Sequence, residues 1–335
     1  MKIFHIPIES YNNRYTADWV EQFEKEFKQE KIDFVTIGDT TLRKIEDGDV
    51  LDATGTHVYK FNQLTELMKL IKAGEVKDDD VIFFADLWCP GIESLFYVRD
   101  VMGLKFKIAG ILHAGTWDPF DFTCRYGMRQ WGQYIELGWL QDIDIIFVAT
   151  KFHKDLIVFN SGNLDHYFDP SKIVVTGIPF YSDLLREKYP VTEKENIIVF
   201  PHRVAPEKNP KRFDRLAKKL KKEFPDWKFI KTMEVTKSRD EYFKLLSRSK
   251  VMISYADQET FGFSTVEAMA LGNYVIVPNR LSYRETVPKQ YRYDNDKKVE
   301  EMLRDFMQRT EIPEYLDLQQ WSRAVNKMIL VMKYI

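Results

Sequence analysis

Strand-like and helix-like segments alternate along almost the whole chain, and this alternation constrains the fold more than any other feature. Helical stretches are amphipathic; residues 16–28, for example, place Trp19, Phe23 and Phe27 on one face. This rhythm predicts parallel sheets with helices on both faces. The expected strands are 3–8, 32–37, 81–85, 105–112, 144–149, 173–175, 197–200, 227–230, 251–254 and 275–277.

The chain has 335 residues, which is long for one ordinary core and predicts two domains. The rhythm breaks in the polar stretch 181–195, which holds Pro190, so we expect a linker there. The predicted fold class is α/β, with two doubly wound Rossmann-like domains, 1–180 and 196–314, facing a central cleft. Ligands of such sheets bind beyond the carboxyl ends of the strands.

Composition excludes several classes of protein. The chain is 44% hydrophobic and 30% charged with a net charge of -2, which is typical of a globular protein and not of a general nucleic-acid binder. Cys89 and Cys124 lack the spacing of metal ligands, so we expect reduced thiols in a cytoplasmic protein. Neither a signal peptide nor a run of about 18 apolar residues is expected from the sequence.

The segment Glu259-Thr-Phe-Gly-Phe-Ser-Thr-Val-Glu267 lies between two expected strands and opens a short helix. Each carboxylate can accept two hydrogen bonds from hydroxyl groups. The start of a helix offers backbone N–H groups and partial positive charge to an anion. The segment therefore predicts a pocket for a sugar joined to a phosphate.

This segment resembles the Glu-x7-Glu signature of retaining glycosyltransferases of the GT-B fold, family four and its relatives. Phe200-Pro-His-Arg203-Val-Ala-Pro-Glu-Lys208-Asn209 resembles the loop after the first strand of that family's second domain, and Arg280-Leu-Ser-Tyr-Arg-Glu285 resembles a later segment. The resemblance covers about 197–287. It is weaker in the first half, where Pro7-Ile-Glu-Ser-Tyr-Asn-Asn13 replaces the family's pair of glycines.

The resemblance implies a GT-B fold whose final helical stretch, 315–335, crosses back to the first domain. It also implies a nucleoside-diphosphate sugar as co-substrate, a UDP- or GDP-sugar, with no other cofactor and no metal. The expected catalytic residues are Arg203, Lys208, Glu259 and His113. The expected donor-binding residues are Phe261, Gly262, Phe263, Glu267, Asn13 and Arg14.

Physical chemistry gives each group a role. Two fixed cations, Arg203 and Lys208, would stabilise the charge that develops on a departing diphosphate. The resemblance assigns Glu259 to the transferred sugar and Glu267 to the ribose. Structural alternatives remain open: Ser264 and Glu267 have the spacing of a capping box, and Asn209 precedes a helix that it would cap. His113 has the alternative of a buried structural histidine.

Two further segments have two interpretations each. The stretch 117–139 is rich in rings and arginine, and is either core packing or an acceptor platform. Its candidate acceptor-binding residues are Trp117, Arg125, Tyr126 and Arg129. The helix Lys211–Lys222 is strongly basic and is either a solvated face or a contact for a phosphate-rich partner.

The sequence thus favours a metal-independent retaining glycosyltransferase that moves a sugar to an acceptor hydroxyl of a saccharide or glycolipid. One alternative is glycosylation of a hydroxylated or hydroxymethylated DNA base, as in the phage enzymes that the chain resembles in size. A second is a non-catalytic nucleotide-sugar-binding protein. The pairs Asp78/Asp80 and Asp142/Asp144 precede expected strands, at the end of the sheet opposite to a ligand site.

Overall fold

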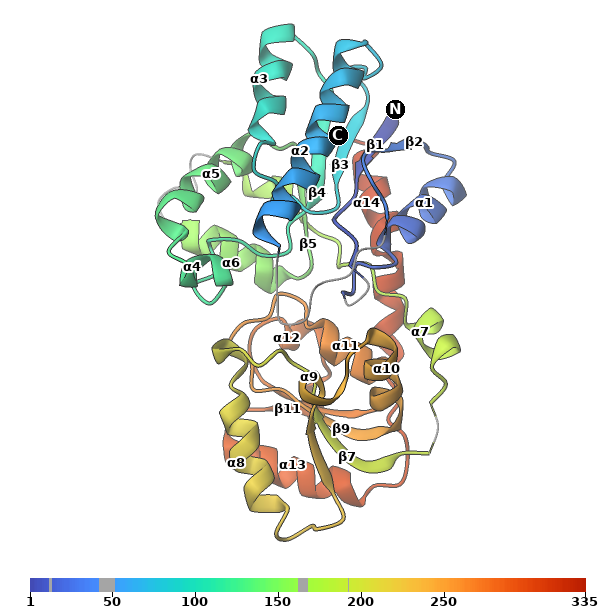
Figure 1. Ribbon diagram of the computed structural model, residues 1–335, viewed down its shortest axis with the longest axis vertical. Coiled ribbons are helices and arrows are strands. Elements are labelled where there is room, and N and C mark those ends of the chain that lie inside the picture. Colours follow the sequence, from blue (N-terminus) through green and yellow to red (C-terminus); the bar gives the residue numbers. More distant parts are fainter. Residues whose placement is uncertain (12–13, 42–51, 162–167, 192) are drawn as a thin grey trace. The chain divides into compact units, whose positions relative to one another are not determined.

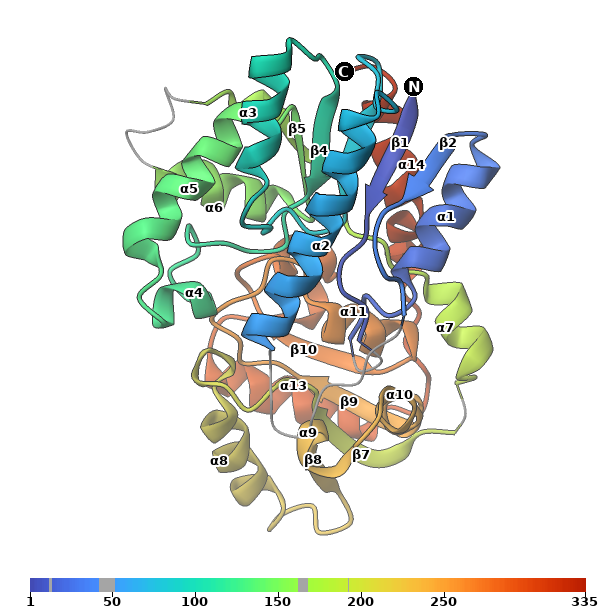
Figure 2. The same cartoon turned by 45° about the horizontal axis from the view of Figure 1, so that its top comes forward.

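The computed structural model describes residues 1–11, 14–41, 52–161, 168–191 and 193–335. The chain forms two compact units (Figures 1 and 2). The first contains Met1–Pro179 together with Ala324–Ile335, and the second contains Phe180–Arg323. Each unit is a parallel sheet with helices packed on it, as the alternating sequence predicts.

The first sheet has six parallel strands in the order β2-β1-β3-β4-β5-β6. Its central strands read as nearly continuous apolar runs because helices cover both faces. In β3 all four residues are buried. The strands are β1 Lys2–Ile6, β2 Asp33–Thr36, β3 Val81–Phe84, β4 Lys107–Ile111, β5 Ile145–Val148 and β6 Ile173–Val175.

The longer helices of the first unit bury apolar side chains in the core. They are α1 Trp19–Gln29, α2 Ala53–Lys72, α3 Glu93–Met102, α4 Phe122–Arg125, α5 Arg129–Asp142, α6 Lys151–Ser161, η2 Pro170–Lys172 and α14 Ala324–Met332. The last of these, α14, packs beside α1 (Figure 1), and Lys333 pairs with Glu30 at 3.2 Å. The end of the chain therefore belongs to the same unit as its beginning.

The second sheet has five parallel strands in the order β11-β10-β9-β7-β8. Its strands are β7 Glu195–Phe200, β8 Lys228–Lys231, β9 Ser249–Ile253, β10 Tyr274–Pro278 and β11 Arg292–Tyr293. Its helices are α7 Ser182–Lys188, η3 Pro206–Lys208, α8 Pro210–Leu220, α9 Thr232–Val235, α10 Arg239–Arg248, α11 Phe263–Ala270, α12 Tyr283–Thr286, η4 Lys289–Tyr291, α13 Asp296–Gln308 and η5 Leu316–Arg323.

The stretch 181–195, which we expected to be a linker, contains α7. This helix packs against α11, and the Arg186 Nε donates to the carbonyl of Ala270 at 2.8 Å. Tyr189, just after the helix, is buried with its ring 5.1 Å from that of Phe243. Polar composition hid a short amphipathic helix that belongs to the second unit.

The expected helix 315–335 is divided at residue 323. Its first part, η5, belongs to the second unit, and its second part, α14, belongs to the first. Within the described part of the chain, no helix combines the length and the hydropathy needed to cross a bilayer.

Candidate functional site

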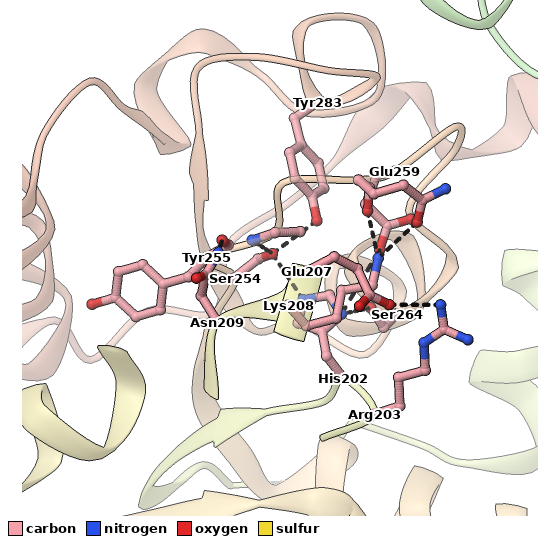
Figure 3. A network of polar contacts seen from close by, with 12 residues as sticks. His202, Arg203, Glu207, Lys208, Asn209, Ser254, Tyr255, Glu259, Ser264 and Tyr283 are labelled. Atoms are coloured by element: carbon pink, nitrogen blue, oxygen red, sulfur yellow. Dashed lines mark hydrogen bonds and ion pairs between the residues drawn. The ribbon is translucent and has the colours of Figure 1, made fainter. Parts of the chain in front are cut away.

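The loops that follow β7, β9 and β10 lie at one edge of the second sheet, because these three strands are parallel neighbours. Each loop carries polar residues that the sequence singled out, and Figure 3 shows their side chains directed toward one another. The edge is the carboxyl end of the sheet, where ligands of doubly wound domains bind.

Lys208, which is buried, and Glu259, which is partly buried, form an ion pair across two of these loops. The Nζ of Lys208 lies 2.8 Å from the Oε1 of Glu259 (Figure 3). The same ammonium donates to the backbone carbonyl of Gln258 and to its Oε1 at 3.3 Å. Lys208 is 5% exposed, so these acceptors compensate the loss of water around its charge. The pair therefore fixes two of the predicted catalytic side chains in one place.

Arg203 is the more accessible cation at this edge. Its NH2 donates to the Oε1 of Glu207 at 2.7 Å, and its side chain is 39% exposed. Glu207 is buried, and its backbone carbonyl accepts the amide of Asp257 at 2.7 Å. A buried carboxylate thus holds a guanidinium whose outer face remains in contact with water. That arrangement suits the binding of an anion.

Asn209 does not play the capping role that the sequence suggested. It lies at the start of α8 in the left-handed conformation, with a φ of 55°, and its side chain makes no capping hydrogen bond. Instead its Nδ2 donates to the carbonyl of Tyr255 at 3.0 Å and to the Oδ2 of Asp257 at 2.6 Å. Asn209 therefore fastens the Lys208 loop to the segment that leads to Glu259.

His202 is a buried residue of this edge that sequence reasoning did not identify. Its Nε2 lies 2.8 Å from the Oγ of Ser254, and that hydroxyl lies 2.8 Å from the hydroxyl of Tyr283. Its Nδ1 lies 3.4 Å from the Oγ of Ser264 and 3.8 Å from the Oε1 of Glu259. Burial, and then the charges of Lys208 and Arg203, lower the pKa of His202 well below its ordinary value, so the imidazole is neutral.

The first turn of α11 brings backbone to the site. Gly262 precedes the helix with a φ of +92°, and a Cβ there would meet the ring of Tyr283 at 3.1 Å, so a side chain is disfavoured on both counts. The ring of Phe261 is 1% exposed and packs against Phe263 and Trp321, with centroids 4.9 and 5.0 Å away. Phe261 therefore anchors the turn, and only its backbone is left to meet a ligand.

Glu267 does not form a capping box with Ser264, so that structural alternative is wrong. The helix begins at Phe263, and Ser264 faces His202 instead of the N–H of Glu267. The Oε2 of Glu267 accepts the hydroxyl of Tyr242 at 3.0 Å, and its Oε1 lies 3.7 Å from the NH2 of Arg239. Burial raises the pKa of this carboxyl, while Arg239 and Tyr242 act against the rise.

In the first unit, His113 follows β4 at the carboxyl end of the sheet. Its Nε2 lies 2.8 Å from the carbonyl of Ala85, and its Nδ1 lies 3.0 Å from the hydroxyl of Tyr15. A carbonyl only accepts, so Nε2 carries the proton and Nδ1 accepts from Tyr15. Burial lowers the pKa of His113, with Asp86 acting in the opposite direction. Both ring nitrogens therefore already have protein partners.

The loop after β1 is described only in part. Asn13 lies outside the described residues. Arg14 stacks over the ring of Tyr11, with 5.1 Å between the guanidinium carbon and the ring centroid. Its predicted role in donor binding remains a prediction.

Sequence reasoning also missed three charged residues at this edge of the first sheet. Lys60 pairs with Asp86 at 2.9 Å, and both are largely buried. Glu136 is 3% exposed and accepts the Trp88 indole N–H at 2.9 Å and the Thr116 amide at 2.9 Å. Burial raises the pKa of Glu136 to about 7, against the effect of these hydrogen bonds. No sequence motif marks these partners.

The aromatic stretch 117–139 divides into core and surface. Trp117 is 2% exposed within the core of the first unit, which favours the core-packing interpretation, and its acceptor contact stays a prediction. Tyr126 is 79% exposed and Arg129 is also exposed, so both remain candidates. The side chain of Arg125 lies outside the described part.

The basic helix and the acidic pairs have structural partners. On α8, Arg212 pairs with Asp296 and Lys219 with Glu300, both from α13. Asp80 accepts the backbone amide of Lys2 at 2.7 Å, and Asp144 pairs with Arg99 at 2.8 Å. Among the residues that the structure describes, no cluster of three or more His, Cys, Asp or Glu has the arrangement of a metal site.

Comparison with known protein families finds no family model that matches the chain. A tRNA-queuosine alpha-mannosyltransferase from Drosophila melanogaster is 40% identical over 68 residues. That match covers 20% of this chain, and it spans only 18% of the length of the mannosyltransferase.

Solved structures match over nearly the whole chain. An alpha,alpha-trehalose-phosphate synthase (UDP-forming) from Burkholderia vietnamiensis has a TM-score of 0.61 at 10% identity, covering 99% of this chain and 95% of its own. A sucrose-phosphate synthase from Thermosynechococcus elongatus has a TM-score of 0.58 at 13% identity, covering 99% and 96%. The catalytic domain of starch synthase IV from Arabidopsis thaliana, bound to ADP and acarbose, has a TM-score of 0.58 at 11% identity, covering 100% and 95%. The chain therefore has the α/β fold of GT-B glycosyltransferases, as its sequence predicts.

Proposed function

We propose that the protein is a retaining glycosyltransferase that uses a nucleoside-diphosphate sugar without a metal ion. The observation that carries the proposal is the convergence of Arg203, Lys208 and Glu259 at the carboxyl edge of the second sheet, with Lys208 and Glu259 in a partly buried ion pair. Two cations and a carboxylate in one place match a diphosphate joined to a sugar. The GT-B fold supports the same assignment.

The main requirement of the proposed reaction is cleavage of the bond between the sugar and the diphosphate. The diphosphate gains negative charge as it leaves. Arg203 and Lys208 stabilise that charge more in the transition state than in the ground state. Glu259 orients the sugar, and Glu267 holds the ribose hydroxyls. The acceptor hydroxyl attacks on the same face and passes its proton to the departing phosphate oxygen, so no separate base is required.

We assign the acceptor to the first unit, where His113 lies at the carboxyl end of β4. A saccharide or a glycolipid is the first candidate. A base of a nucleic acid is the second, favoured by the local identity with a tRNA-queuosine alpha-mannosyltransferase and by the exposed Tyr126 and Arg129. Exposed rings next to arginine can stack on a base and contact its phosphate.

The donor assignment is tested by thermal unfolding with UDP, GDP, ADP, TDP and CMP, each with and without magnesium. A ligand present at about 100 times its Kd stabilises the unit that binds it by roughly 2.7 kcal/mol, which gives a shift of several degrees. We expect one diphosphate to stand out without help from magnesium. A flat response to all five would overturn the assignment, and binding without transfer or hydrolysis would favour a non-catalytic binder.

The effect of salt concentration on transfer distinguishes the two classes of acceptor. Neutralisation of phosphates by basic side chains makes nucleic-acid binding fall steeply as salt rises. With the matching sugar nucleotide as donor, transfer to oligonucleotides or tRNA should therefore decline sharply between low and moderate salt. Transfer to a neutral saccharide should change little over the same range.

A further inference from the structure

The second unit contains a buried polar chain that the proposed reaction does not use. It runs from Ser264 through His202 and Ser254 to Tyr283 (Figure 3), and joins the loop after β7 to the end of β9, the start of α11 and helix α12. His202 is 4% exposed, while Ser254 and Tyr283 are fully buried. Buried polar groups that are all satisfied restrict a structure to one arrangement.

The number of protons on these groups determines which of them donates and which accepts in each hydrogen bond. A serine hydroxyl has one proton and two acceptor positions, and the amide of Ala256 takes one of these at 3.3 Å. Of the two remaining neighbours of Ser254, His202 and Tyr283, one must therefore donate to the hydroxyl and the other must accept from it. The choice depends on which nitrogen of His202 carries its proton.

Glu259 decides that choice. Its Oε1 lies 3.8 Å from the Nδ1 of His202. A lone pair on Nδ1 would face the negative carboxylate, whereas an N–H there is attracted to it. This attraction favours a proton on Nδ1, which also faces the Oγ of Ser264 at the long end of hydrogen-bond distance. It follows that Ser254 donates to Nε2 and that Tyr283 donates to Ser254.

We propose that His202 is a positioning residue whose Nδ1–H tautomer fastens the loop carrying Arg203 to the loop carrying Glu259, and so sets the distance between the diphosphate-binding cation and the sugar-binding carboxylate. Arg203 is its neighbour in the chain, so any shift of the imidazole moves the guanidinium. Ser254 and Ser264 stand on either side of the segment that holds Glu259. This inference rests on the donor site proposed above.

The tautomer of His202 can be measured directly, without an activity assay. Nitrogen-15 shifts of the imidazole distinguish Nδ1–H, Nε2–H and the doubly protonated ring, and loss of the signal in His202→Gln assigns it. We expect a neutral Nδ1–H ring in the full-length protein at pH 7. An Nε2–H ring, or a charged ring, would overturn the proposal.

Binding provides the functional readout. UDP, GDP and ADP are each titrated by calorimetry into the wild type, His202→Ala, His202→Gln and the exposed control Arg215→Ala. We expect His202→Ala to bind the preferred nucleotide about tenfold more weakly, since it removes the acceptor for the proton of the buried Ser254 hydroxyl. His202→Gln can still accept from Ser254 and should recover most of the affinity, and the control should match the wild type.

The outcomes separate the two proposals. If the wild type binds none of the three nucleotides, the donor site itself is wrong. If the wild type binds one and His202→Ala binds it equally well, the donor site stands and the positioning role is overturned. Should His202→Ala fail to fold, Ser254→Ala removes only the hydroxyl that meets Nε2, and we expect the same weakening; unchanged affinity there would also overturn the role.

Discussion

Each of the two sheets has a neutral histidine just beyond the carboxyl end of an inner strand, and we propose for His202 the tautomer opposite to that of His113. In the first unit the carbonyl of Ala85 requires His113 to carry its proton on Nε2. In the second unit Glu259 favours the proton of His202 on Nδ1. The ring is the same, and its neighbours decide which nitrogen can donate.

The surrounding charges differ as well. At the second edge each carboxylate is met by a cation, in the pairs Lys208–Glu259 and Arg203–Glu207. The first edge also has such a pair, Lys60–Asp86, but there Glu136 is met only by two neutral N–H groups, those of Trp88 and Thr116. The first edge therefore adds a carboxyl whose charge changes near neutral pH. The following variants test that difference.

The largest effect should come from Lys208→Met. The change leaves the partly buried Glu259 carboxylate without its cation, which should destabilise the second unit by about 2 kcal/mol as well as abolishing turnover. Adding Glu259→Gln removes the orphaned charge, so the double variant should recover much of the stability but none of the activity. Chemical denaturation and a transfer assay measure the two quantities, with Lys218→Met on the exposed side of α8 as control. A single variant as stable as the wild type would contradict the importance of this pair.

Arg203→Ala combined with Glu207→Gln should separate catalysis from stability at the same edge. The second change removes the charge of the buried Glu207, which would otherwise lose its cation, and Arg203 itself is 39% exposed, so the free energy of unfolding should change little. Turnover should fall roughly a hundredfold or more, because the variant lacks a hydrogen-bond donor directed at the negative charge that develops on the diphosphate. Steady-state kinetics give kcat, and Arg215→Ala is the matched exposed control. Near wild-type turnover would remove Arg203 from the diphosphate assignment.

His113→Gln tests whether the first edge takes part in the reaction. We expect kcat to fall about tenfold while the affinity for the donor stays the same, since the residue belongs to the proposed acceptor side. Tyr15→Phe is the companion variant, because it releases Nδ1 while keeping the ring in place; it should retain turnover. If His113→Gln lowers only the melting temperature, the residue is structural.

The sequence alone predicted those parts of the site whose residues lie close together along the chain. Arg203 and Lys208 are five positions apart in one loop, and Glu259 and Glu267 flank a single turn, so strand periodicity was enough to place them at the carboxyl edge. The strands of both sheets lie where the sequence has runs of apolar residues. Local pattern is informative where the contacting residues are also neighbours in sequence.

The contacts that escaped prediction join distant parts of the chain. Lys60 and Asp86 are 26 positions apart, and Trp88 and Glu136 are 48 apart. His202 and Ser254 are 52 apart. No spacing rule connects such residues, since helices of variable length intervene. The same limit explains Glu267: its local capping partner was visible in the sequence, but Tyr242, which it contacts, was not.

Glu136→Gln should give the smallest effect and the clearest contrast between the two edges. The pKa of Glu136 is about 7 in the folded protein against 4.5 for an ordinary glutamate. Because the folded-state pKa is raised, its contribution to stability is fully present below pH 4.5 and is lost as pH rises through 7. Glutamine keeps an acceptor for Trp88 and Thr116 but cannot ionise.

The free energy of unfolding of the variant should therefore match that of the wild type at pH 5 and exceed it by about 1 to 2 kcal/mol at pH 8. Denaturation curves at the two pH values measure this, and an equal difference at both would mean that Glu136 does not titrate there. The side chain also lies against Gly115, where a Cβ would come within 2.6 Å of its Oε2, so the test needs an isostere and not a larger residue.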